Sequence, residues 1–149
     1  MPTEPQPSSE RDGQNPFRDL LGVRVTDTGP GTATVVIDPV PATLLQGRGI
    51  VHGGVFATLI DCAAGEAVRT VMAAGDDGFT VDLNITYLRP VIDSPLKACG
   101  RAVSCGRSVG VAAADIADGS GALVATGRAT FAIRPRNRVT VRPPEPGHP

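Results

Sequence analysis

The segment from Gly53 to about Ala73 is apolar on almost every side, and it limits the possible folds more than any other stretch of the chain. An α-helix without a polar face has to be buried by other structure. Near the middle of the segment, the run VFATLIDCAA carries one acid, Asp61. Because a buried carboxylate is desolvated at a large free-energy cost, an acid seldom stands there for packing alone. The sequence therefore predicts one long buried helix with an acid that has a chemical task.

The rest of the chain has the two-residue hydrophobic period of β-strands. The alternation is clearest from Phe79 to Tyr87, and further strands are predicted over residues 23–25, 33–37, 96–105, 109–117 and 123–133. No helix separates the last four strands, so the sheet is predicted to be mainly antiparallel. The expected fold class is α+β, with one long helix against a sheet of about six strands.

A length of 149 residues suits one domain, which we place at residues 16–134. Residues 1–15 and 135–149 are rich in proline and in polar or charged residues, and they are predicted to be flexible tails. Residues 16–21 are predicted to form a helical turn that packs Phe17 and Leu20. Gly75 and a turn at Asp76–Gly78 are predicted to end the long helix.

The composition argues against several classes of function. The net charge is -1 and only 3% of the residues are aromatic, which disfavours nucleic-acid binding. The cysteines Cys62, Cys99 and Cys105 have no metal-ligand spacing, and they are predicted to be small buried residues of a protein in a reducing, cytoplasmic compartment. The N-terminal residues lack the apolar segment of a secretory signal, and charges interrupt the longest apolar run, so neither secretion nor a membrane span is expected.

Glycines at the start of the long helix supply the second half of a candidate active site. The Gly53 amide has no acceptor within the helix and lies at the positive end of the helix dipole, where it can stabilise an oxyanion. Asp61 follows about 12 Å further along the helix axis, yet both groups must come within ~3 Å of one reacting centre. Two antiparallel copies of the helix across a twofold axis solve this problem, and Gly65 suits such a close crossing. We therefore predict a homodimer with shared sites.

The polar residues around this pair have alternative interpretations. His52 is a general base or, in the interpretation we favour, fixes the loop by hydrogen bonds to the backbone, since a base needs a nucleophile within reach. The alternative for Asp61 is contact with solvent or an arginine. Cys62 is a nucleophile only if His52 serves as its base. Glu66 and Arg69 are predicted to form an ion pair at the surface or at an interface.

Several motifs together carry a family resemblance. They are Gln46, His52-Gly53-Gly54 with Asp61, the strand Thr80-Val81-Asp82-Leu83-Asn84-Ile85-Thr86-Tyr87, and Ala125-Thr126-Gly127-Arg128. From about Leu20 to Ile133 the chain resembles the hotdog-fold acyl-CoA thioesterases of the phenylacetate-pathway type. The resemblance implies the hotdog fold, in which a curved antiparallel sheet wraps one long central helix. It also implies homodimers with joined sheets and antiparallel helices, which often pair into tetramers.

The resemblance implies catalytic roles for five residues. The Gly53 amide would polarise the thioester carbonyl, and Asp61 of the partner subunit would attack that carbonyl or activate a water. Gln46 would orient the nucleophile or the leaving sulfur, His52 would hold the loop, and Thr80 would assist the acid. The strand alternation, however, predicts Thr80 on the face opposite the core, from which it reaches a site only if the strand begins at the subunit junction.

Substrate contacts are also implied by the resemblance. They are Gly54 and, for the phosphates of coenzyme A, Arg89, Arg107, Ser108 and Arg128, because arginine binds phosphate through paired hydrogen bonds. Surface solubility is the alternative for each arginine. No metal or redox cofactor is implied, since coenzyme A is part of the substrate.

The predicted function is hydrolysis of an acyl-CoA or aryl-CoA to the free acid and coenzyme A. One alternative is a hydratase or dehydratase of the same fold acting on acyl-CoA or acyl carrier protein, but the second histidine, His148, lies in the tail. The other alternative is a non-catalytic acyl-CoA-binding module, against which the presence of Asp61 argues. The acyl group stays open, and Phe56, Leu59 and Met72 are predicted to shape its pocket.

Overall fold

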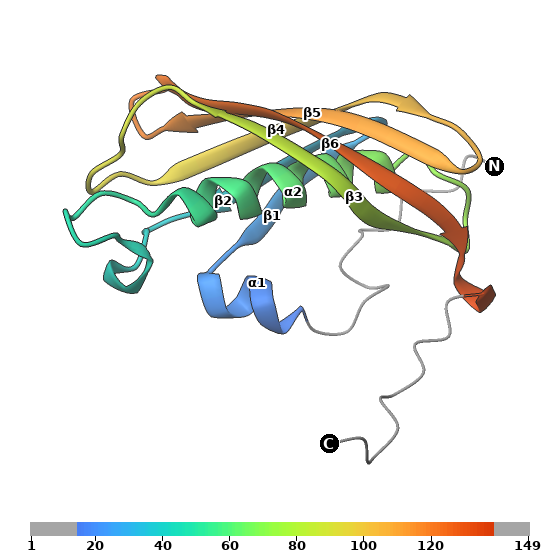
Figure 1. Ribbon diagram of the computed structural model, residues 1–149, viewed down its shortest axis with the longest axis horizontal. Coiled ribbons are helices and arrows are strands. Elements are labelled where there is room, and N and C mark those ends of the chain that lie inside the picture. Colours follow the sequence, from blue (N-terminus) through green and yellow to red (C-terminus); the bar gives the residue numbers. More distant parts are fainter. Residues whose placement is uncertain (1–14, 139–149) are drawn as a thin grey trace, which may run out of the picture.

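One long helix, α2 (Gly53–Arg69), lies in the hollow of a curved, six-stranded sheet in the computed structural model, which describes residues 15–138 (Figure 1). The strands are β1 (Arg24–Gly29), β2 (Thr32–Ile37), β3 (Asp76–Tyr87), β4 (Leu96–Cys105), β5 (Val109–Asp118) and β6 (Leu123–Pro135). A short helix, α1 (Pro16–Leu21), and the 3-10 turns η2 (Ala42–Leu44) and η3 (Arg136–Arg138) complete the described elements.

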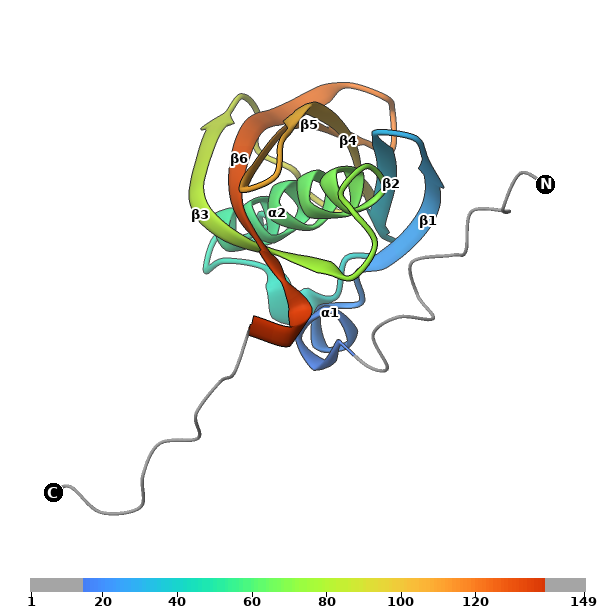
Figure 2. The same ribbon diagram turned by 90° about the vertical axis from the view of Figure 1, so that its right-hand side faces the viewer.

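The sheet order is β1-β2-β4-β5-β6-β3, and every neighbouring pair is antiparallel. Seen almost end-on, the strands curl around α2 and leave one side of the helix uncovered by the sheet (Figure 2). The predicted α+β hotdog arrangement, one central helix with about six antiparallel strands, is confirmed.

The core lies between α2 and the concave face of the sheet. Alternate side chains of β2, β4 and β5 are buried, and Leu59, Ile60 and Ala63 of α2 have no exposed surface. Gly100 of β4 permits the closest approach, since a Cβ at this position would overlap the backbone carbonyl of Ala63. The depth of the helix against the sheet is therefore set by a glycine.

The C-terminal end of α2 differs from the prediction. The helix ends at Arg69, and Asp76–Gly78 begin β3 instead of forming a turn. The Thr70 hydroxyl donates to the Ala67 carbonyl and accepts from the Gly31 amide, both at 2.7 Å. The bond from Gly31 ties the helix end to the β1–β2 turn, so a tertiary contact, in addition to the local bond to Ala67, marks this boundary.

α1 forms where a helical turn is predicted, but its packing is different. Phe17 and Leu20 are 58% and 78% exposed, so the prediction that they pack is wrong. Leu21 contacts the core instead, because it lies on the face of α1 that turns inward. Asn15, assigned above to the tail, accepts a hydrogen bond from the Arg18 amide at 3.2 Å and caps the helix.

Three further predictions need correction. Cys62 is buried, but Cys99 is exposed and Cys105 half-buried, because strand alternation turns Cys99 to the convex face. Glu66 is buried and bonded to Arg18, so it is not a surface residue. Residues 135–138 are ordered as the end of β6 and η3 and are not a loose tail. The remaining predicted tail residues, 1–14 and 139–149, lie outside the described residues.

β3 is an edge strand with apolar side chains open to solvent. Phe79, Val81, Leu83 and Tyr87 are 42%, 63%, 37% and 54% exposed, respectively. The predicted alternation breaks at Val81, where a β-bulge shifts the pairing with β6. A long apolar edge strand of this kind is a template for pairing with another chain.

Residues 15–138 contain neither a helix suited to span a membrane nor a cluster of metal-binding side chains. None of the helices there combines the length and the hydropathy that a membrane-spanning helix needs. No group of three or more His, Cys, Asp or Glu side chains in that range is arranged to hold a metal ion.

Candidate functional site

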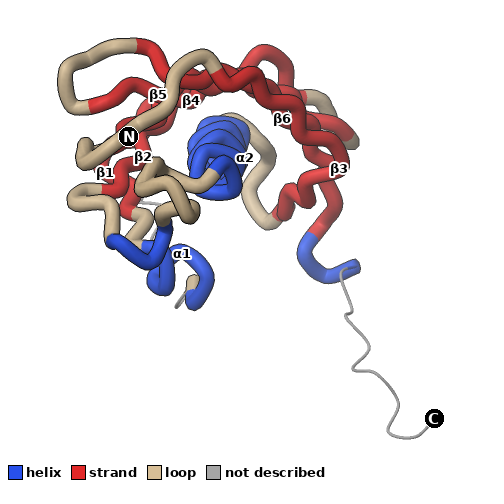
Figure 3. Tube along the Cα trace, turned by 60° about the vertical axis from the view of Figure 1, so that its left-hand side comes forward, coloured by secondary structure: helices blue, strands red, loops and turns tan. Residues whose placement is uncertain are grey.

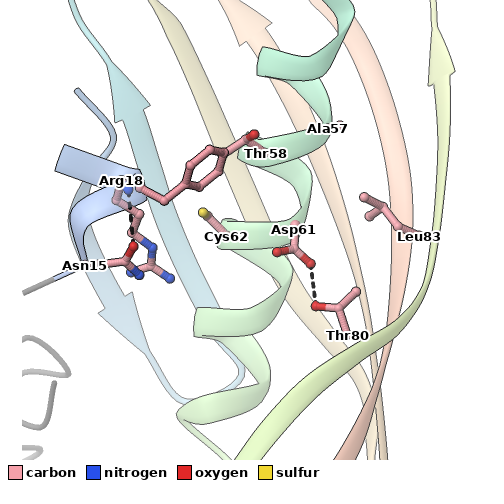
Figure 4. Close-up of a pocket in the computed structure, with 9 residues that line it drawn as sticks. Asn15, Arg18, Ala57, Thr58, Asp61, Cys62, Thr80 and Leu83 are labelled. Carbon is pink, nitrogen blue, oxygen red and sulfur yellow. Dashed lines mark hydrogen bonds between the residues drawn. The ribbon is translucent and has the colours of Figure 1, made fainter. Parts of the chain in front are cut away.

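Asp61 faces β3 from the middle of α2 and is held by Thr80. The Thr80 hydroxyl donates to Asp61 Oδ1 at 2.7 Å, and the two side chains point toward each other (Figure 4). The bulge at Val81 places Thr80 on the same side of the sheet as Leu83, which strict alternation would not do. The prediction that Thr80 faces away from the core side is therefore wrong. Thr80 reaches Asp61 within one chain.

A pocket of about 400 Å³ opens beside this pair. α1 and the residue before it line one side, α2 forms the floor, and β3 forms the other side; the lining residues are Asn15, Phe17, Arg18, Ala57, Thr58, Asp61, Cys62, Thr80 and Leu83. A second pocket of about 100 Å³ also reaches Asp61 and Thr80, and Gly65, Met72 and Phe131 are among its lining residues. The carboxylate therefore stands between two cavities and has access to solvent and to a ligand.

The residues predicted to shape an acyl pocket are mostly elsewhere. Phe56 and Leu59 are buried in the core, at 3% and 0% exposure, and of the three only Met72 lines a pocket beside Asp61, the smaller of the two. Phe56 packs edge-on against the Tyr87 ring, with ring centroids 5.8 Å apart. The helical period alone does not say which apolar residues face a pocket and which face the sheet.

His52 caps α2 in the way that the structural interpretation predicts. Its Nδ1 accepts a hydrogen bond from the Gly54 amide at 2.9 Å. A ring nitrogen that accepts carries no proton, so this geometry assigns the imidazole proton to Nε2. The Gly53 amide, by contrast, has no hydrogen-bond acceptor among residues 15–138. It is left as the open donor at the positive end of the helix dipole.

Tyr87 is a residue of the site for which the sequence predicted a place in a strand but no role in the site. Its hydroxyl donates to the Gly53 carbonyl at 3.0 Å. A Cβ at Gly53 would lie 3.3 Å from the Tyr87 hydroxyl oxygen, so the glycine also allows close contact between the helix start and the ring. The exposed aromatic at the end of a strand was the available signal. Its partner, 34 residues away in sequence, was not predictable.

Gln46 lies in the loop before His52, at the same end of α2 as Gly53. Its backbone N–H donates to the Ile50 carbonyl at 2.8 Å and its backbone carbonyl accepts from the Gly49 N–H at 2.9 Å, which closes a tight turn. Gln46 is exposed and does not line either pocket beside Asp61. Within one chain, therefore, Gln46 and Gly54 lie near Gly53 at the start of α2 and do not line the pockets beside Asp61.

The residues predicted to contact phosphate are exposed, but within one chain they do not lie together at a single site. Arg107 and Ser108 lie in the β4–β5 turn, and Arg89 lies near Asp118, where β5 ends and the β5–β6 turn begins. These two turns are at opposite ends of the ten-residue β5, about 33 Å apart along the strand. Arg128 is on the convex face of β6, paired with Asn84 of β3.

Cys62 lies next to Asp61 in sequence and lines the larger pocket. Burial raises the pKa of its thiol above the ordinary value, although the adjacent Arg18 guanidinium acts in the opposite direction. A raised pKa keeps the thiol protonated near neutral pH, and the protonated thiol is the poor nucleophile. Asp61 is therefore the better candidate for the reacting group.

A curved sheet around one long helix, an acid at mid-helix and an open amide at its start define the class of hotdog-fold thioester hydrolases. The family model of the thioesterase superfamily matches residues 48–125, and the chain belongs to this superfamily. The resemblance deduced from the motifs is thus confirmed, as is the prediction of a thioester hydrolase.

Individual relatives agree with this assignment. A protein of Halobacterium salinarum described as an esterase is 40% identical over 125 residues, which cover 76% of this chain and 82% of that protein. Acyl-coenzyme A thioesterase 13 of Mus musculus is 33% identical over 84 residues, 55% of this chain and 59% of that protein. The solved structure of the E. coli PaaI protein, from the phenylacetic acid degradation operon, has a TM-score of 0.72 at 25% identity and covers 79% of this chain and 83% of that chain.

Proposed function

We propose that this protein hydrolyses acyl-CoA thioesters at sites shared between the two subunits of a homodimer. Asp61 is the nucleophile or general base, and the Gly53 amide is the oxyanion donor. The observation that carries the proposal is the order of contacts along β3. Thr80 bonds to Asp61 near the start of the strand, and Tyr87 bonds to Gly53 at its end.

β3 supplies the geometry of the proposed dimer. Its free edge and exposed apolar side chains suit antiparallel pairing with the same strand of a second copy. A twofold axis midway between Thr80 and Tyr87 places Thr80 of one copy beside Tyr87 of the other. Asp61 of the first copy then faces Gly53 of the second, which removes the separation of about 12 Å that a single helix imposes.

The chemistry follows from the two groups that meet. The thioester carbonyl oxygen accepts a hydrogen bond from the Gly53 amide, and the positive end of the α2 dipole stabilises its developing negative charge. Because Thr80 bonds to Oδ1 of Asp61, Oδ2 is left to attack the carbonyl carbon or to take a proton from an attacking water.

Both routes give the same products. Collapse of the tetrahedral intermediate breaks the C–S bond, and the leaving thiolate takes up a proton to become coenzyme A. After direct attack, a water hydrolyses the mixed anhydride on Asp61, whereas after water attack the free acid forms at once.

The proposed substrate spans the subunit boundary. The acyl group occupies the pocket of about 400 Å³ beside Asp61, and the thioester lies between Asp61 and Gly53. Gln46 and Gly54 lie at the Gly53 end, and Arg89 follows Tyr87 closely in sequence, so it is the first of the proposed phosphate contacts at that end. Arg107, Ser108 and Arg128 are further candidates for contact with the phosphates of coenzyme A. Dimerisation brings a second copy of each residue, so the partner subunit can supply contacts that one chain does not.

Thiol release from a panel of aryl-CoA and aliphatic acyl-CoA esters tests the activity. We expect hydrolysis by the wild type and a loss of at least ~100-fold in Asp61→Asn, with circular dichroism showing that the variant stays folded. Wild-type rates in Asp61→Asn would contradict the assignment. A hydratase would change the acyl chain without releasing thiol, and a binding module would do neither.

The amide of Gly53 can be removed selectively. Proline is well tolerated as the first residue of a helix, and His52 has the extended conformation (φ -64°, ψ 139°) that a residue before proline requires. Gly53→Pro therefore deletes the N–H and leaves the helix start intact. Gly53→Ala is the matched control, since it adds a Cβ at the same place and keeps the N–H. We expect a loss of about 100-fold in Gly53→Pro and a much smaller loss in Gly53→Ala.

Mixed dimers test whether the site is shared. Asp61→Asn and Gly53→Pro subunits, co-expressed in equal amounts, form dimers of which half are mixed, and each mixed dimer contains one site with both groups intact. We expect activity to return to about a quarter of the wild-type value. Sites contained within single subunits would stay inactive in every mixture, and that result would refute the shared site.

A further inference from the structure

We propose that Phe17 of α1 sets the size of the acyl group that the enzyme accepts, and that the ion pair between Arg18 and Glu66 fixes α1 in the position this requires. The inference rests on the proposed function, because it assigns the pocket of about 400 Å³ to the acyl group.

α1 covers the side of α2 that the sheet leaves open. The strands lie on one side of α2, and α1 lies on the other (Figures 2 and 3). Asn15 and Arg18 stand on one side of Asp61, while Thr80 and Leu83 stand on the other (Figure 4). The pocket is thus bounded by the main fold on two sides and by a separate, six-residue helix on the third.

Apolar packing holds α1 only weakly. Phe17 and Leu20 are more than half exposed, and Leu21 alone among the apolar residues of α1 packs against the main core cluster. A helix this short has little stability of its own. Some other contact must therefore fix the position of the helix.

Charge provides that contact. Arg18 Nη1 lies 2.7 Å from Glu66 Oε1, and the Glu66 side chain is only 3% exposed. The other carboxylate oxygen, Oε2, is buried and has no hydrogen-bond partner among residues 15–138. Arg18 is therefore the counter-charge that the structure gives this buried acid. If α1 moved away, the buried acid would lose this partner, which is strongly unfavourable.

Phe17 is the largest apolar side chain that lines the pocket. Ala57 on the floor and Leu83 opposite are also apolar, which suits an acyl chain. A chain that starts at Asp61 and extends along this floor ends against the wall to which Phe17 belongs. A pocket of about 400 Å³ is near the lower end of the usual range for ligand sites. We infer a preference for short or compact acyl groups, with Phe17 excluding longer chains.

The test compares Phe17→Ala with Leu20→Ala. Leu20 is on the same helix but is 78% exposed and does not line the pocket, so it is a matched control for loss of an apolar side chain from α1. The ratio of kcat/KM for decanoyl-CoA to that for butyryl-CoA is measured for each. We expect the ratio to rise at least ~10-fold in Phe17→Ala and to stay at the wild-type value in Leu20→Ala.

Glu66→Gln tests the ion pair, because it removes the buried charge that attracts Arg18 without leaving an uncompensated carboxylate. We expect amide hydrogens between Arg18 and Val23 to exchange faster, and the decanoyl to butyryl ratio to rise in the same direction as in Phe17→Ala. Unchanged exchange together with an unchanged ratio would overturn the role of the ion pair.

Binding of thioether analogues of the two esters separates this inference from the proposed function. The affinity ratio for the decanoyl and butyryl analogues should shift in Phe17→Ala as the kinetic ratio does. An unshifted ratio in both measurements would overturn the role of Phe17. If the wild type bound both analogues but released thiol from no ester, the proposed function would fail, and the affinity ratio would still decide the role of Phe17.

Discussion

The contact between Gly100 and α2 leads to a prediction about stability. A Cβ at Gly100 would lie 2.5 Å from the Ala63 carbonyl carbon, whereas ordinary contacts begin at 3.4 Å. The Ala63 carbonyl oxygen would lie closer still, so Gly100→Ala must move β4 and α2 apart by at least about 0.9 Å. The obstacle is backbone, which cannot rotate away as a side chain can, so we expect the upper part of the usual overpacking range, about 3 kcal/mol.

A loss of this size is a large fraction of the stability of a domain, which is roughly 5–15 kcal/mol. Urea unfolding followed by circular dichroism, at one fixed protein concentration, measures it. Gly47→Ala is the control, because a Cβ at Gly47 meets nothing within 4 Å. Ala63 is two residues from Asp61, so the same displacement should also reduce thioester hydrolysis. A stability of Gly100→Ala within about 0.5 kcal/mol of the wild type would refute the reasoning.

Two further predictions concern β3 and the β5–β6 turn. Val81 is 63% exposed on the free edge, so Val81→Lys should leave the subunit folded but shift the protein to monomers in analytical ultracentrifugation and abolish thiol release; a fully active monomer would contradict the shared site. Hydrogen bonds from Ser120 and from the Ala122 amide hold the pKa of Asp118 below its ordinary value of 3.8. Asp118 should therefore stabilise the fold fully above that value, and its advantage over Asp118→Asn in urea unfolding should disappear as pH falls through the lower folded-state pKa; an advantage independent of pH would be inconsistent with this.

The parts of the fold that follow from local pattern were predictable from the sequence. The all-round apolar character of residues 53–69 marks a buried helix, and the two-residue period marks the strands, since both depend on which faces are covered. The turn at Asp118 has its own signature, because the Asp118 carboxylate accepts hydrogen bonds from the Ser120 and Ala122 amides. The acid in the helix and the glycines at its start were recognisable for the same reason.

The contacts that complete the site join distant parts of the chain, and local pattern does not encode them. The bulge at Val81 is defined by pairing with β6, and it reverses the expected direction of Thr80. The hydrogen bond from the Tyr87 hydroxyl to the Gly53 carbonyl and the ion pair between Arg18 and Glu66 likewise form only once the chain is folded. Leu20 shows the converse, because a helical period marks an apolar residue without saying whether anything covers it.

The bulge in β3 makes the length of this strand a constraint on the enzyme. One residue added or removed between Thr80 and Tyr87 would turn one of the two side chains to the outside of the sheet, and either the acid or the helix start would lose its support. Relatives that keep both contacts should therefore vary in the length of their loops and termini but conserve the number of residues between these two positions. In an alignment of sequences that have a hydroxyl residue and a tyrosine at these two positions, the number of residues between them is expected to be constant.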